Sequence, residues 1–194
     1  MSAVTVKTYA APEISEKEIL RYAGGGVTDE IKKLMSLSVL EARDAFTYKA
    51  CYTVCPICVS ENVVDFGFFA VKSKNLSKNL SGCKKAVIFA ATVGFEIDRL
   101  IMKHTRLSPA RALMLNAFGT ERIEALCDAF CDDMKKEYGS CRPRFSAGYG
   151  DLPLEAQREI FKLLSPASRI GLTLTDSLLM TPSKSVTAFI GIED

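Results

Sequence analysis

The residue types best suited to binding a small charged molecule occur together at positions 144–150, which read Arg-Phe-Ser-Ala-Gly-Tyr-Gly. A guanidinium such as that of Arg144 pairs with a carboxylate through two parallel hydrogen bonds, and a tyrosine ring such as that of Tyr149 attracts a cation. The glycines on both sides of Tyr149 let the backbone turn and approach a ligand closely. This run therefore suits a small zwitterion. The same spacing also fits a surface arginine followed by a turn into a helix capped by Asp151.

The pattern Arg-x-x-x-Gly-Tyr in this run resembles the S-adenosylmethionine-binding motif of the activation domain of cobalamin-dependent methionine synthase. The resemblance continues through residues 170–177 and 180–186, which look like that family's Gly-x-x-Leu-Thr-Glu-Ser and Pro-x-x-Ser-Val elements in the same order. It is strongest over residues 141–190, whereas the first 80 residues look more like separate single-domain relatives.

The resemblance implies binding roles for several residues of the run. Arg144 would contact the carboxylate of S-adenosylmethionine, and Ala147, Gly148 and Tyr149 would form the loop around its adenosyl part and its sulfonium. No residue is expected to act as a catalytic acid or base, and the resemblance implies no metal bound by this chain.

Glu124 stands where the family has a further glutamate that contacts the ligand. Helical spacing also places Glu124 next to Cys127 and Cys131, on a half-apolar stripe where a carboxylate needs a partner such as the ligand's ammonium. The alternative is an ordinary exposed carboxylate on the surface of a helix.

The sequence departs from the family at two places. The family usually has proline after the tyrosine, whereas this chain has Gly150, which loosens the loop. The fused domain also has a ligand-contacting tyrosine beyond the Pro-x-x-Ser-Val element, and because this sequence ends at Asp194 we expect that contact to be absent or replaced.

The resemblance implies a reactivation role in which the chain holds S-adenosylmethionine and the cobalamin is carried only by a partner protein. The partner would be cobalamin-dependent methionine synthase or another corrinoid methyltransferase, and a flavodoxin- or ferredoxin-like protein would donate the electron. The chain would then be an accessory component of a methyltransferase, and the sequence does not decide whether it is an enzyme in its own right. A docking subunit that has lost the ligand is the alternative within this role.

A third hypothesis rests on the cysteines at positions 51, 55 and 58, whose spacing equals that of the iron-sulfur loop of radical S-adenosylmethionine enzymes. The surrounding residues are typical of a strand, in which Cys51 and Cys55 face one side and Cys58 the other. The spacing therefore favours packing over a cluster. Likewise Cys127 and Cys131 are expected to pack in the core, and His104, next to Lys103, to face solvent.

Composition excludes several classes of protein. Hydrophobic residues make up 48% and charged residues 25% of the 194 residues, with a net charge of +2, which indicates a globular chain without general affinity for nucleic acid. The sequence has no apolar run long enough to span a membrane and no export signal at its start. We therefore expect a cytoplasmic protein whose seven cysteines are reduced.

The order of elements predicts an α+β fold, a mainly antiparallel twisted sheet with flanking helices, in one domain over residues 1–194. Residues 1–48 are expected to form an N-terminal helical extension packed on that domain. The apolar run 86–93 predicts a central strand, and Ser108 and Gly139 bound a long helix.

The remaining patterns predict shorter elements. Ser15 and Thr28 are expected to cap helices, with Gly24-Gly25-Gly26 as a linker between them. Further expected elements are a hairpin of 50–59 with 62–72, helices over 75–80, 95–104 and 153–164, and strands near 4–10, 141–147, 170–174 and 185–192. In the strand over 141–147, Arg142, Arg144 and Ser146 would share one face.

Overall fold

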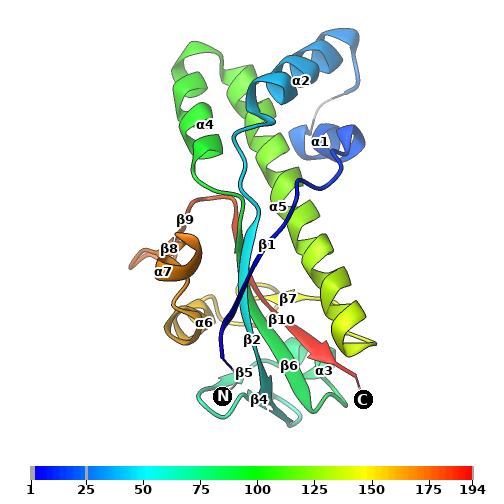
Figure 1. The fold of residues 1–194 in the computed structure, drawn as a ribbon, viewed down its shortest axis with the longest axis vertical. Coiled ribbons are helices and arrows are strands. Elements are labelled where there is room, and N and C mark those ends of the chain that lie inside the picture. The colour runs from blue at the N-terminus through cyan, green and yellow to red at the C-terminus, as the bar shows by residue number, and fades with distance from the viewer. Residues whose placement is uncertain (1–2, 25, 194) are drawn as a thin grey trace.

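A five-stranded antiparallel sheet separates two groups of helices in the computed structural model, which describes residues 3–24 and 26–193 (Figure 1). Its strand order is β1-β2-β6-β10-β7. The strands are β1 (Thr5–Thr8), β2 (Lys49–Pro56), β6 (Lys85–Thr92), β7 (Phe145–Ser146) and β10 (Ser185–Ile192). The predicted α+β class with a mainly antiparallel sheet and flanking helices is confirmed.

Strand β6 lies at the centre of the sheet, as its continuous apolar sequence predicts. Every residue of β6 after Lys85 is buried, because β2 and β10 pair with it along its whole length and side chains cover both of its faces. Val87 and Phe89 point into one apolar core, and Ala86 and Ile88 into the other. The alternation of side chains along a strand thus serves two separate cores.

The first face of the sheet is covered by the long helix α5 with three other helices against it. These are α1 (Glu16–Ala23), α2 (Asp29–Ala42), α4 (Glu96–Leu107) and α5 (Pro109–Tyr138). Phe130 of α5 stacks on Phe89 of β6 with ring centroids 4.5 Å apart, and Ile19 of α1 is fully buried in the same core. Figure 1 shows α5 running along much of the length of the molecule.

The second face carries shorter elements. These are β3 (Cys58–Val59), β4 (Val63–Asp65), β5 (Ala70–Lys72), α3 (Lys74–Asn79), α6 (Ala156–Leu164), α7 (Pro166–Ile170), β8 (Thr173–Leu174) and β9 (Met180–Thr181). Phe66 stacks on Phe189 of β10 with centroids 4.8 Å apart, and this pair lies in the second core. The sheet therefore has an aromatic contact on each face.

The predicted caps at the start of the chain are confirmed. The Ser15 hydroxyl accepts from the Glu18 N–H and the Thr28 hydroxyl from the Ile31 N–H, while Gly24 ends α1 with a left-handed φ of 68°. Gly25 of the predicted linker lies outside the described residues. Ser108 precedes α5 as expected, but its side chain makes no capping hydrogen bond.

Several predicted boundaries are wrong. Residues 49–56 pair with β1 and β6. Of the predicted pairing between 50–59 and 62–72, only β3 with β4 forms, while β4 pairs in turn with β5. Cys51 and Cys55 are buried on one face of β2 and Tyr52 on the other, and an isolated hairpin cannot cover both faces. The predicted helix over 153–164 begins only at Ala156, and Ile170 ends a helix instead of beginning a strand.

The expectation that His104 faces solvent is also wrong. His104 is only 7% exposed, and its Nε2 lies 3.0 Å from Oε1 of Glu41 on α2. Helical periodicity explains the burial, because positions 100, 101 and 104 fall on one face of α4, where Leu100 and Ile101 pack on the first core. The polar neighbours of His104 in the sequence lie on other faces of the helix.

Candidate functional site

Arg144 lies on a segment that follows the outer edge of β10 after α5 ends. Cys141 forms a single bridge with Ile192, the N–H of Arg142 donates to the Gly191 carbonyl at 2.8 Å, and pairing resumes at Phe145 and Ser146. The predicted strand over 141–147 is therefore reduced to two residues, since Pro143 has no N–H to donate to β10.

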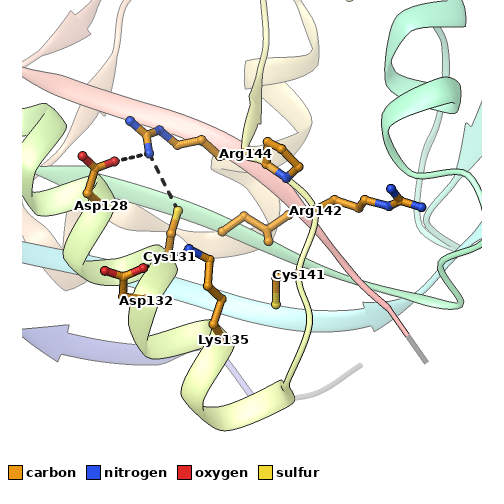
Figure 2. A pocket seen from close by; sticks show the side chains of 9 residues that line it. Asp128, Cys131, Asp132, Lys135, Cys141, Arg142 and Arg144 are labelled. Carbon is orange, nitrogen blue, oxygen red and sulfur yellow. Dashed lines mark hydrogen bonds and ion pairs between the residues drawn. The ribbon is translucent and has the colours of Figure 1, made fainter.

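The expectation that Arg142 and Arg144 share one face is wrong for the same reason. Arg142 pairs with Glu193 at 2.9 Å and its guanidinium donates to the Ser81 carbonyl at 3.3 Å. Arg144 turns instead toward α5, and Figure 2 shows the two guanidinium groups pointing away from each other. Ser146, half-buried, sits in β7 beside Ala188.

The guanidinium of Arg144 is held between two carboxylates of α5. Its Nη2 donates to Oε2 of Glu124 at 2.6 Å. Its Nη1 donates to Oδ1 of Asp128, also at 2.6 Å, and lies 3.9 Å from the Cys131 sulfur (Figure 2). Positions 124, 128 and 131 follow one face of the helix, which is why all three reach the same arginine. The structure thus brings together Arg144 and Glu124, two of the residues singled out in the sequence.

Asp128 is the member of this group that the sequence analysis missed. The signal was present, because Asp128 follows Glu124 by one helical turn and such pairs lie side by side on a helix. The side chain of Asp128 is 67% exposed, compared with 39% for Glu124 and 25% for Arg144. The arginine is therefore the most enclosed member of the group and Asp128 the least.

The charge states follow from these contacts. Burial alone lowers the pKa of Arg144, but its hydrogen bonds to Asp128 and Glu124 outweigh that effect and leave the pKa raised, so the guanidinium stays charged. Burial raises the pKa of Cys131, which the nearby guanidinium only partly offsets, and burial likewise raises the pKa of Cys127. Both thiols are therefore protonated at neutral pH, in keeping with a packing role.

Two cavities meet at the arginine. The larger, of about 770 Å³, lies between α5 and residues 141–144 and is lined by Asp128, Cys131, Asp132, Lys135, Cys141, Arg142, Pro143, Arg144 and Ile190 (Figure 2). The smaller, of about 360 Å³, lies between α1 and α5 and is lined by Glu13, Ser15, Glu18, Arg21, Tyr22, Glu121, Glu124, Ala125, Asp128 and Arg144. Arg144 and Asp128 border both, so a small molecule in either cavity would meet the guanidinium.

The loop after β7 turns back sharply at two glycines. Gly148 and Gly150 have φ of 84° and 59°, a region that side chains disfavour, and the Gly148 N–H donates to the Leu152 carbonyl at 3.0 Å. A side chain at position 150 would also approach the Asn75 amide nitrogen to 2.3 Å. Proline, the usual family residue at this point, cannot adopt this φ.

Tyr149 lines neither of the two cavities at the arginine. Its ring is 70% exposed and packs edge-on against Phe145 at 5.5 Å, where it lines a separate cavity of about 360 Å³ with Arg142 and Lys78 among its walls. Ala147 packs against the second core. The structure therefore places the turn 147–149 next to Arg144 in the chain but does not bring the Tyr149 ring to the guanidinium.

Asp151 has a different role from the one that its spacing suggests. Its carboxylate accepts from the Ser73 hydroxyl at 2.5 Å and from the N–H groups of Lys74 and Asn75 at 2.8 and 3.1 Å, at the start of α3. The Ser73 hydrogen bond is the largest reason that the pKa of Asp151 is lowered. The turn is thereby tied to α3, and Asp151 does not cap the helix that follows it.

The cysteines at 51, 55 and 58 lie as a strand predicts. Cys51 and Cys55 are buried in β2 and Cys58 is exposed at the start of β3, so the three thiols do not converge. Among residues 3–24 and 26–193, no group of three or more His, Cys, Asp or Glu side chains is placed to hold a metal ion. No helix in this part of the chain combines the length and the apolar character that crossing a membrane requires.

Comparison with known proteins identifies the family. A model of the vitamin B12 dependent methionine synthase activation domain matches residues 76–194. The crystal structure of the MetH reactivation domain bound to AdoHcy matches with a TM-score of 0.75 at 14% sequence identity, over 98% of this chain and 78% of that one, which shows a shared fold. A search of curated proteins gave no match. Since the family model covers more than half of its length, this chain belongs to the vitamin B12 dependent methionine synthase activation domain family.

Proposed function

We propose that this protein is an S-adenosylmethionine-binding reactivation factor that supports the reductive methylation of cob(II)alamin on a partner cobalamin-dependent methionine synthase. The observation that carries the proposal is the charged guanidinium of Arg144, held between Glu124 and Asp128 where two cavities meet. Membership of the activation domain family supports it, as does the shared fold with a reactivation domain that was solved with AdoHcy.

The arrangement around Arg144 is complementary to an amino acid. A ligand carboxylate would replace Asp128 on Nη1, since an exposed ion pair of this kind contributes only about 0–1 kcal/mol and is easily exchanged. Glu124, which is more enclosed, would remain next to the arginine and accept from the ligand's ammonium. An arginine ion pair for the ligand carboxylate and a carboxylate for the ligand ammonium together distinguish a zwitterion from a simple anion.

The turn at 147–149 would border the adenosyl part of the ligand. Ala147 and Gly148 expose little side chain, which leaves room for an adenine edge, and the exposed ring of Tyr149 is available to a sulfonium once it turns toward the arginine. The glycines at 148 and 150 supply the backbone freedom for that movement.

The ligand would supply an electrophilic methyl group, and this chain would supply its position. Holding the sulfonium at an open surface brings the methyl within reach of a corrinoid on a docked partner, which is catalysis by proximity alone. The partner's cob(II)alamin would be the methyl acceptor once a flavodoxin- or ferredoxin-like donor has supplied one electron, and S-adenosylhomocysteine would be left on this chain. The partner is proposed to be methionine synthase, with another corrinoid methyltransferase as the alternative.

A second candidate function is a docking subunit that binds no S-adenosylmethionine. The observation in its favour is that both Nη atoms of Arg144 already have carboxylate partners from this chain, so the guanidinium is satisfied without a ligand. The two candidates differ in whether a zwitterion displaces Asp128.

Calorimetric titration with S-adenosylmethionine separates them. We expect a Kd of tens of micromolar for the wild type and a loss of about 2 kcal/mol, roughly thirtyfold, for Arg144→Ala, because a charge-assisted pair is removed. Arg99→Ala is the matched control, since Arg99 pairs with Glu96 in an exposed contact on α4 and lines neither cavity at Arg144, and the affinity of this variant should stay within twofold of wild type. No binding by the wild type at millimolar ligand supports the docking subunit instead.

A further inference from the structure

The net positive charge of this chain comes from one short stretch of the sequence. Between Asp65 and Glu96 there is no acidic residue and no arginine, but there are five lysines, all of them exposed: Lys72, Lys74, Lys78, Lys84 and Lys85. The remainder of the chain has 20 basic and 23 acidic residues, so it is net negative while the whole is +2. We call these five residues the lysine face.

The fold brings the lysine face to one end of the molecule. Lys72 ends β5, Lys74 and Lys78 lie one helical turn apart on α3, and the last two lysines lead into β6. Figure 1 shows α3, β5 and the start of β6 together at the end opposite α2 and α4. Within residues 3–24 and 26–193, Lys72, Lys74, Lys78 and Lys85 have no carboxylate within ion-pairing distance.

A groove of about 440 Å³ crosses this face between α3 and the β3–β4 turn. It is lined by Val59, Ser60, Glu61, Lys74, Ser77, Lys78, Ser81 and Gly82. The Ser77 oxygen is buried beneath the groove, whereas Lys74 and Lys78 are exposed. A carboxylate entering the groove would therefore pair with Lys74 and Lys78.

The lysine face also adjoins the Tyr149 loop. Lys78 lines both this groove and the cavity that Tyr149 and Arg142 border, so the two regions form one surface. A molecule docked on the lysine face would therefore lie beside the turn at 147–149.

We propose that the lysine face is a docking surface for an acidic protein, which inserts an Asp or Glu side chain between Lys74 and Lys78. A protein fits better than a nucleic acid for two reasons. Arginine, the residue most used for phosphate and base contacts, is not among the residues that line the groove itself. The positive surface is also limited by two carboxylates, Glu61 in the groove and Asp151 at the start of α3. A surface limited in this way can accept a single carboxylate but would repel a continuous polyanion.

The test uses a purified flavodoxin, which belongs to the class of electron donors named in the proposed function. The inference rests on the proposed function only in this choice of probe. We expect Lys74→Glu/Lys78→Glu to weaken flavodoxin binding by tenfold or more at 50 mM salt, and the wild-type affinity to fall steeply between 50 and 200 mM. The matched control is Lys32→Glu/Lys33→Glu on α2, which changes the net charge by the same amount at exposed residues of another element. The flavodoxin affinity of this control should stay within twofold of wild type.

Several outcomes would overturn the docking proposal. One is an equal loss of flavodoxin affinity in both glutamate double variants, and another is no flavodoxin binding by the wild type at 50 mM salt. A third is tighter binding of the wild type to a 20-nucleotide single strand or to phosphatidylserine vesicles than to flavodoxin. Lys74→Ala/Lys78→Ala, a milder change, should weaken binding in the same direction by at least threefold. Each variant is also titrated with S-adenosylmethionine, whose unchanged affinity distinguishes loss of docking from failure of the ligand site.

Discussion

Two carboxylates share the guanidinium of Arg144, and the proposed binding mode gives them opposite effects on the ligand. Asp128 competes with the ligand carboxylate, whereas Glu124 accepts from the ligand ammonium. We therefore expect Asp128→Asn to tighten S-adenosylmethionine binding by up to about fivefold, the equivalent of an exposed ion pair of up to 1 kcal/mol. Glu124→Gln should weaken binding by roughly tenfold, because a charge-assisted hydrogen bond is lost.

The two variants control for each other, since both replace a carboxylate by an amide of the same shape and both leave Arg144 in place. Calorimetry at one ionic strength gives the two affinities, and the urea midpoint of each variant checks that folding is intact. If both substitutions moved the affinity in the same direction, the assignment of Asp128 as a competitor and Glu124 as a ligand partner would be incorrect.

At the scale of the elements, α2, α4 and α5 are joined by one carboxylate. Glu41 of α2 accepts from His104 of α4 at 3.0 Å and pairs with Arg111 of α5 at 2.7 Å and with Lys103 at 3.5 Å. The His104 hydrogen bond is the largest cause of a pKa of Glu41 below its usual 4.5. A carboxylate whose pKa is lower in the folded state stabilises the fold above its unfolded-state pKa, and the contribution disappears as pH falls through the folded-state value.

We therefore expect Glu41→Gln to lower the free energy of unfolding by about 1 kcal/mol at pH 7, and the difference from wild type to shrink as the pH falls below 4.5. Urea denaturation at pH 7, 5 and 3.5 measures it. Glu96→Gln is the control, because Glu96 pairs with Arg99 in an exposed contact on α4, and this substitution should cost about a few tenths of a kcal/mol. A difference for Glu41→Gln that stays constant with pH would contradict the prediction.

Elements with a strong local signal are the ones that the sequence predicts well. The apolar run of β6 and the caps of α1 and α2 are local features, and all three lie where expected. The burial of His104 depends on which helix face meets α2, and the shortening of the strand at 141–147 depends on how Pro143 meets β10. Such errors arise where tertiary contacts outweigh local composition.

The candidate site shows the same division. Arg144 and Glu124 were found because their sequence context resembles a family motif, and they meet in the structure. The contact with Asp128 was missed because it needs the register between α5 and the edge of β10, which no short motif contains. The direction of the Tyr149 ring likewise depends on the left-handed glycines around it and on its packing against Phe145.

At the scale of the whole molecule, the first part of the chain is built into the fold, which bears on the proposal of one domain over residues 1–194. Strand β1 pairs with β2, and Ile19 of α1 and Met35 of α2 are buried in the first core. The guanidinium of Arg122, itself only 1% exposed, donates to the carbonyls of Pro12 and Glu13 at 2.7 Å and pairs with Glu121. The N-terminal segment thus supplies partners to a buried charge.

Deleting residues 1–48 should therefore abolish cooperative folding instead of trimming an accessory extension. The deletion exposes the apolar face of α5, opens the edge of β2, and removes two acceptors from Arg122, so several kcal/mol are lost together from a fold of marginal stability. Urea denaturation followed by far-ultraviolet circular dichroism, with dye binding to exposed apolar surface, measures the outcome. Deletion of residues 1–3, which leaves β1 intact, is the control. A truncated chain that unfolds cooperatively at the wild-type midpoint would show that residues 49–194 are a domain by themselves, and that the N-terminal segment is an extension that the fold does not need.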